Sequence, residues 1–88
     1  MNERELEKPL KALANKRRLA ILGYLKRSKE SSVGDIAHKI ELSYRSTSKH
    51  LGILSSAGIV EKEQRSTVIY YHLNPVIFRD YSNIISKL

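Results

Sequence analysis

The sequence predicts a mainly α-helical fold of about five helices with one small β-hairpin. Up to Gly58, leucine and isoleucine recur every three or four residues, which is the spacing of one helical face. After Gly58 the pattern changes to the alternation typical of strands. A third observation, an Asn74-Pro75 pair followed by a new apolar stripe, predicts one more helix at the end.

Two helices are expected before residue 28. Leu6, Leu10 and Leu13 share one face of a helix over residues 3–13, although Pro9 would start or kink it. Asn15 is a suitable N-cap for a second helix over 16–27. Residues 28–32 are expected to be a connection.

The next two helices form a helix-turn-helix unit. A short helix is expected over 33–39, and a longer one runs from its N-cap, Ser43, to about residue 57. Gly58 follows, where a left-handed residue closes a helix most easily. Strands over 59–63 and 68–73, joined by a polar tip at 64–67, complete the pattern of a winged helix-turn-helix with a two-stranded wing.

The chain is long enough for one domain, residues 1–88, and too short for two. A domain of this size buries about 60% of the surface of its unfolded chain, so it needs further stabilisation. With no cysteine, disulfides cannot provide it, but a second subunit could.

Charge indicates a polyanionic partner. Sixteen lysines and arginines stand against nine acidic residues, a formal charge of +7. Residues 8–29 hold eight of these cations and no acid, although a solvated helix face would explain them equally well. With Thr47, Leu51 and Leu54 turned inward, the helix after Ser43 would present to DNA Tyr44, Arg45, Ser46, Ser48 and Lys49.

Other DNA contacts are expected from two more places. Arg65 and Ser66 at the wing tip could reach a phosphate or the minor groove. Lys16, Arg17 and Arg18, at the start of the second helix, could contact phosphates. One of the three could instead brace the fold by pairing with a carboxylate. Each wing or helix cation considered alone could also be an ordinary solvated side chain.

Four segments in order resemble the ArsR-type (arsenical resistance repressor-like) winged-helix regulators. They are LANKRRLAIL at 13–22, LSYRSTSKHL at 42–51, LSSAGIV at 54–60 and YYHLNP at 70–75. The resemblance implies a winged-helix dimer on a palindromic operator, with Ser48, Lys49 and their neighbours reading bases. Where the family's metal sensors carry cysteines, this chain has Ser32 and Gly34.

A metal or catalytic site is not expected. The last helix offers Asp80 without a histidine, and no two of His38, His50 and His72 have the i, i+4 spacing of a helical metal site. His50 matches a position that usually packs between helices in this fold. No catalytic grouping or cofactor motif is visible, so an enzyme is not predicted.

The two terminal helices are expected to form a dimer interface. Their apolar residues exceed what a small domain needs, although the stripe could also complete the monomer core. The expected interface residues are Leu6, Leu10, Ile77, Tyr81, Ile84, Ile85 and Leu88. A twofold dimer would set two recognition helices about 34–36 Å apart, which matches a palindromic site.

Together these features predict a homodimeric repressor that reads double-stranded DNA. The alternatives are a sequence-neutral nucleic-acid binder and a winged helix that binds protein. No signal peptide or membrane span is visible, so a cytoplasmic location without a membrane partner is expected. The operator and any effector are not given by the residues.

Overall fold

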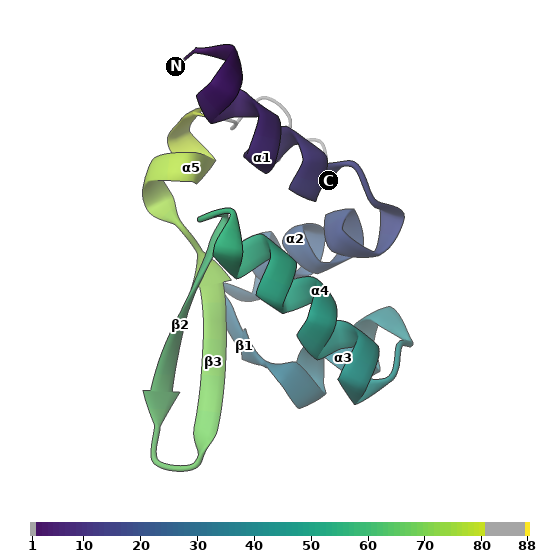
Figure 1. Ribbon diagram of the computed structural model, residues 1–88. Coiled ribbons are helices and arrows are strands. Elements are labelled where there is room, and N and C mark those ends of the chain that lie inside the picture. The colour runs from purple at the N-terminus through teal and green to yellow at the C-terminus, as the bar shows by residue number, and fades with distance from the viewer. Residues whose placement is uncertain (1, 81–87) are drawn as a thin grey trace.

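The computed structural model describes residues 2–80 and residue 88. Helices α1, α2, α3 and α4 form one body, and the hairpin of β2 and β3 extends from it (Figure 1). The elements in chain order are α1 (Glu3–Leu13), α2 (Lys16–Ser28), β1 (Glu30–Ser32), α3 (Val33–Ile40), α4 (Tyr44–Ser56), β2 (Val60–Arg65), β3 (Val68–Leu73) and α5 (Pro75–Asp80).

Short polar side chains begin the helices, as expected. Asn15 Oδ1 accepts the backbone N–H groups of Arg17 and Arg18 at 2.9 and 3.1 Å. Ser43 Oγ accepts that of Ser46 at 3.1 Å, which fixes the first turn of α4. Each bond satisfies a helix N–H that has no partner within the helix.

The backbone shows the outcome of two predictions, for Pro9 in α1 and for Gly58 after α4. Pro9 neither starts nor ends α1, which runs through it with the proline ring buried. Gly58 closes α4 as predicted: its φ is +75°, and the next N–H, of Ile59, bonds to the carbonyl of Leu54 at 2.9 Å. That closure turns the chain from α4 directly into β2.

The sheet has three strands, so the prediction of a two-stranded wing was incomplete. Residues 30–32, expected to be a connection, form β1 and pair antiparallel with β3, giving the order β1-β3-β2. The two-stranded hairpin itself is confirmed, with Val60 opposite Leu73 and Arg65 opposite Val68. β1 ties the base of the wing to the helices.

The core lies where α2, α3 and α4 meet the base of the sheet. Its fully buried members include Ile21, Leu22, Ile36, Leu51 and Ile59. The inward face of α4 is therefore fixed by packing against the other helices of the body and the hairpin, which positions its outward face. Over residues 2–80 and 88, no helix has the length and apolar character needed to cross a membrane.

Candidate nucleic-acid interface

Helix α4 has two distinct faces. Thr47, Leu51 and Leu54 are completely buried, as the spacing predicted. On the other side, Tyr44 keeps 64% of its surface exposed, and Arg45 and Lys49 are also exposed. Ser46 and Ser48 are partly exposed between the two faces. The outward face thus carries two cations, an aromatic hydroxyl and two small hydroxyls.

The start of α4 and the wing border one hollow of about 260 Å³. Tyr44 lines it from α4, and Thr67, Val68 and Ile69 line it from the hairpin. Gly34 of α3 lies on the same wall. Helix α4 and the wing therefore belong to one continuous surface, as a nucleic-acid interface would require.

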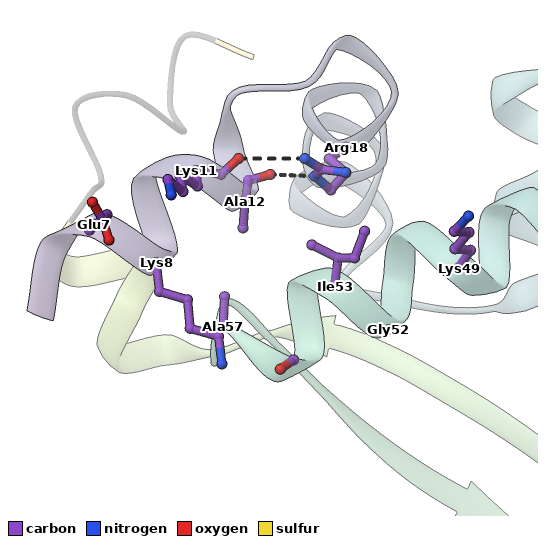
Figure 2. A pocket seen from close by; sticks show the side chains of 10 residues that line it. Glu7, Lys8, Lys11, Ala12, Arg18, Lys49, Gly52, Ile53 and Ala57 are labelled. Carbon is purple, nitrogen blue, oxygen red and sulfur yellow. Dashed lines mark hydrogen bonds between the residues drawn. The ribbon is translucent and has the colours of Figure 1, made fainter.

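Arg18 links α1, α2 and α4 through contacts within the protein. Its Nε donates to the carbonyl of Ala12 at 2.6 Å, and Nη2 donates to that of Lys11 at 3.4 Å (Figure 2). Nη1 lies 3.3 Å from His50 Nδ1. The prediction that one cation of this cluster braces the fold is confirmed for Arg18. The predicted carboxylate partner is wrong, because Arg18 bonds to two backbone carbonyls and lies beside an imidazole. Lys16 and Arg17 remain exposed at the start of α2.

His50 has the structural position expected for it. Partial burial, and then the positive charges of Arg18, Arg17 and Lys49, lower the pKa of its imidazole below the ordinary value. The neutral ring can accept a hydrogen bond from Arg18, which a protonated ring could not do. His50 therefore links α4 to α2 as an uncharged acceptor.

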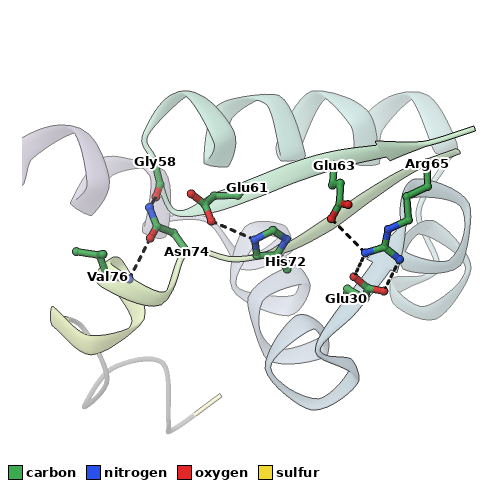
Figure 3. A network of polar contacts seen from close by, with 8 residues as sticks. All are labelled: Glu30, Gly58, Glu61, Glu63, Arg65, His72, Asn74 and Val76. Carbon is green, nitrogen blue, oxygen red and sulfur yellow. Dashed lines mark hydrogen bonds and ion pairs between the residues drawn. The ribbon is translucent and has the colours of Figure 1, made fainter.

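Arg65 is bound within the protein itself. Its guanidinium donates to both carboxylate oxygens of Glu30, at 2.8 and 2.6 Å, and lies 3.3 Å from Glu63 (Figure 3). It also sits over the ring of Tyr70, 4.7 Å from the centroid. The pKa of Arg65 is raised chiefly by the Glu30 bond, and the same bond lowers the pKa of Glu30.

The position of Arg65 differs from the sequence expectation. It was placed in the tip, but it is the last residue of β2, and the turn consists of Ser66 and Thr67. Ser66 is exposed there with a φ of 58°. Because β1 was not predicted, Glu30 was missed as the partner of Arg65. Opposite charge at residues 30 and 65 was visible, but their pairing depends on the register of β1.

The expected dimer residues fall into three groups. Leu10 is 45% exposed on α1, and Leu6 is partly buried. Ile77 and Leu88 are partly buried against the core of the same chain. Tyr81, Ile84 and Ile85 lie outside the described residues. Val76, which belongs to the apolar stripe predicted after Pro75 but not to the expected interface set, is 52% exposed on α5.

Within residues 2–80 and 88, histidine and acidic side chains do not gather in groups of three or more that could hold a metal ion. His72 lies 3.1 Å from Glu61 on the wing, far in sequence from the other two histidines.

A model of the helix-turn-helix domain family matches residues 13–63, which covers α2 through most of β2. The chain belongs to the ArsR-type winged helix-turn-helix regulators. Among curated members of this group, the transcriptional activator HlyU of Vibrio cholerae is 34% identical over 95 residues, covering 100% of this chain and 87% of HlyU. The transcriptional repressor SdpR of Bacillus subtilis is 36% identical over 73 residues, 83% of this chain and 80% of SdpR.

Solved structures of ArsR-type proteins have the same fold. Reduced HlyU from Vibrio cholerae superimposes with a TM-score of 0.84 at 31% identity, covering 98% of this chain and 90% of that one. The homodimeric winged helix-turn-helix DNA-binding domain of Mb0332 from Mycobacterium bovis gives a TM-score of 0.82 at 31% identity. It covers 96% of this chain and 74% of that one. The winged-helix prediction is confirmed.

Proposed function

We propose that this protein is a homodimeric repressor that reads a palindromic operator by placing α4 in the major groove of double-stranded DNA. The division of α4 into two faces carries the proposal. Its buried face fixes the helix, and its outer face offers Tyr44, Arg45, Ser46, Ser48 and Lys49, whose donors suit base edges and phosphates. At thirteen residues, α4 is about 20 Å long, which fits the groove.

Phosphate contacts would come from the exposed Lys16 and Arg17 and from the wing. Both side chains are exposed at the amino end of α2, and Arg17 lies near enough to α4 to lower the pKa of His50. Ser66 can donate from the turn, whereas Arg65 must share or release its carboxylates to meet a phosphate. We therefore expect Arg65 to contribute less to binding than the α4 cations.

A dimer is supported by the exposed apolar side chains of the terminal helices. Leu10 and Val76 are about half exposed. Leu6 lies about one helical turn before Leu10 on α1, and Ile77 follows Val76 on α5. We place the partner subunit there, together with Tyr81, Ile84, Ile85 and Leu88. The homodimeric state of the Mb0332 domain supports the same assembly. The protein acts in this proposal by binding alone, without a catalytic step or cofactor.

The experiment is selection of bound duplexes from a random pool, followed by competition. We expect a palindromic sequence to be enriched, and a selected duplex to resist competition by random duplex. Sedimentation equilibrium should give two chains per selected duplex. Equal competition by random duplex would show a sequence-neutral binder, and the absence of DNA binding at low salt would leave the protein-binding alternative.

A further inference from the structure

A groove of about 610 Å³ lies between α1 and α4, on the side of α4 away from the wing (Figure 2). Its volume falls in the range of small-molecule sites, about 300–1,000 Å³. The metal positions of ArsR-type sensors considered above are on α3 and the last helix, whereas this groove is walled by α1 and α4. Its lining combines an apolar floor with a cationic rim.

The floor is made of small and aliphatic groups. Ala12 of α1 faces Ile53 and the end of α4 at Ala57. Ile53 keeps 38% of its surface exposed, although the neighbouring Leu51 and Leu54 are fully buried. A Cβ atom placed on Gly52 would meet no atom within 4 Å, so the space beside it is open. An apolar ligand could therefore cover Ile53 without moving the backbone.

The rim carries lysines from both helices. Lys8 and Lys11 lie on α1 and Lys49 on α4, and Glu7 is the one acidic residue among those that line the groove. In the described part of the chain, none of these lysines is in an ion pair. Figure 2 shows the Lys8 side chain extending from α1 toward Ala57. The guanidinium of Arg18 already bonds to two carbonyls, so the lysines would bind an anion.

We propose that the groove binds an amphipathic organic anion, with an apolar body and one terminal carboxylate or sulfonate. The body would cover Ile53 and Ala57, and the acidic group would lie against the lysines. A neutral apolar molecule would not pair with the lysines, and a small inorganic anion would leave the apolar floor exposed to water. Both should bind more weakly than a molecule that carries the two features together.

Such binding would affect DNA through Lys49. This residue lines the groove and also belongs to the outer face of α4. A bound anion beside Lys49 would neutralise a charge that the DNA needs, so ligand and DNA should compete. This regulatory step rests on the proposed function, whereas binding of the anion does not.

Binding can be tested on the full chain without DNA. The probe is 8-anilinonaphthalene-1-sulfonate, followed by its fluorescence, with decanoate as competitor. We expect saturable binding of one probe per chain and displacement by decanoate, but not by the same concentration of decanol or acetate. Non-saturable fluorescence, or displacement by acetate as effective as by decanoate, would overturn the proposal.

Two matched pairs of variants locate the site. Gly52→Leu should fill the groove and weaken probe binding about tenfold, whereas Gly34→Leu, at another helical glycine with open space, should not. Lys8→Glu should weaken it about threefold, and Arg4→Glu, the same charge change on α1 outside the groove, should not. Thermal unfolding checks that each variant folds. Equal effects of the two members of a pair would place the probe elsewhere.

The regulatory step has its own readout. Decanoate should lower the affinity for a selected duplex in the wild type and lose that effect in Gly52→Leu. If decanoate displaces the probe but leaves DNA affinity unchanged, the link through Lys49 is wrong. If the protein binds no duplex at any salt concentration, the proposed function fails, while the probe experiment still decides whether the groove binds anions.

Discussion

Helix α4 and the wing both carry cations, but in different electrostatic settings. Helix α4 contains Arg45 and Lys49 and no acidic residue, and both side chains are exposed. The wing strand β2 alternates acids and bases, and its Arg65 is held by Glu30 and Glu63. The α4 cations are thus open to a polyanion, whereas Arg65 of the wing is already paired with two carboxylates.

The difference shows that a cation's availability depends on its partners more than on its place in a motif. For Arg65 to meet a phosphate, the phosphate must replace or join two carboxylates, and those carboxylates repel it. The same contacts, with stacking on Tyr70, hold the wing against β1. The contacts of Arg65 therefore support a role in positioning the wing, and the proposal gives sequence reading to α4.

The largest expected effect comes from truncating the α4 cations. Arg45→Ala or Lys49→Ala should weaken binding to a selected duplex by about 1–3 kcal/mol, or roughly 5- to 150-fold, and relax the preference at one base pair of each half-site. Fluorescence anisotropy with the selected duplex and single-base variants measures both. Unchanged affinity and selectivity in both mutants would remove α4 from the reading role.

A smaller effect should separate Lys16 from Arg65. If Lys16 of each subunit contacts a phosphate, Lys16→Ala should lower the slope of log K against log salt by about 1.8, which is about 0.9 for each lost contact. Arg65→Ala should change the slope less, because its charge is already paired. Arg4→Ala on the exposed start of α1 is the control. A larger slope change for Arg65→Ala than for Lys16→Ala would reverse our ranking of the two regions.

Freeing the wing cation should strengthen binding to any duplex. Glu30→Gln removes the nearer of the two carboxylates that hold Arg65, so affinity should rise modestly and equally for selected and random DNA. Arg65→Ala should then cost more in the Glu30→Gln background than in the wild type, which a double-mutant cycle measures. A loss of affinity in Glu30→Gln would mean that Glu30 presents Arg65 to DNA.

The smallest expected effect is a pH dependence of stability through His50. Because its pKa in the folded state lies below the ordinary 6.5, the unfolded chain takes up the proton more readily. The contribution of His50 is thus fully present above pH 6.5 and is lost as pH falls through the lowered folded pKa. Urea unfolding at pH 7.5 and 5.5 should show a weaker pH dependence for His50→Gln. An identical dependence in both proteins would contradict the neutral-acceptor role.

Local patterns were enough to predict most of the fold. The caps at Asn15 and Ser43, the closure at Gly58 and the buried stripe of α4 each depend on residues close in sequence. The exposure of Tyr44, Arg45 and Lys49 followed directly from that stripe. These features are set by helical periodicity and by hydrogen bonds that span a few residues.

Features that depend on distant pairing could not be predicted in the same way. Strand β1 has three residues and no alternation, and it forms only because β3 offers a free edge. Its residue Glu30 then meets Arg65, thirty-five positions away. Arg18 likewise bonds to carbonyl groups of α1, a contact that no pattern of side chains in the sequence predicts. The groove between α1 and α4 is also a product of tertiary packing.

The relative contributions of α4 and the wing to DNA binding can be measured directly from backbone amide NMR shifts during titration with a selected duplex at moderate salt. We expect the largest shift changes at residues 44–49, smaller ones at 16–17, and the smallest at 65–66. Shift changes concentrated at 65–66, with residues 44–49 unaffected, would contradict the claim that the outer face of α4 reads the DNA.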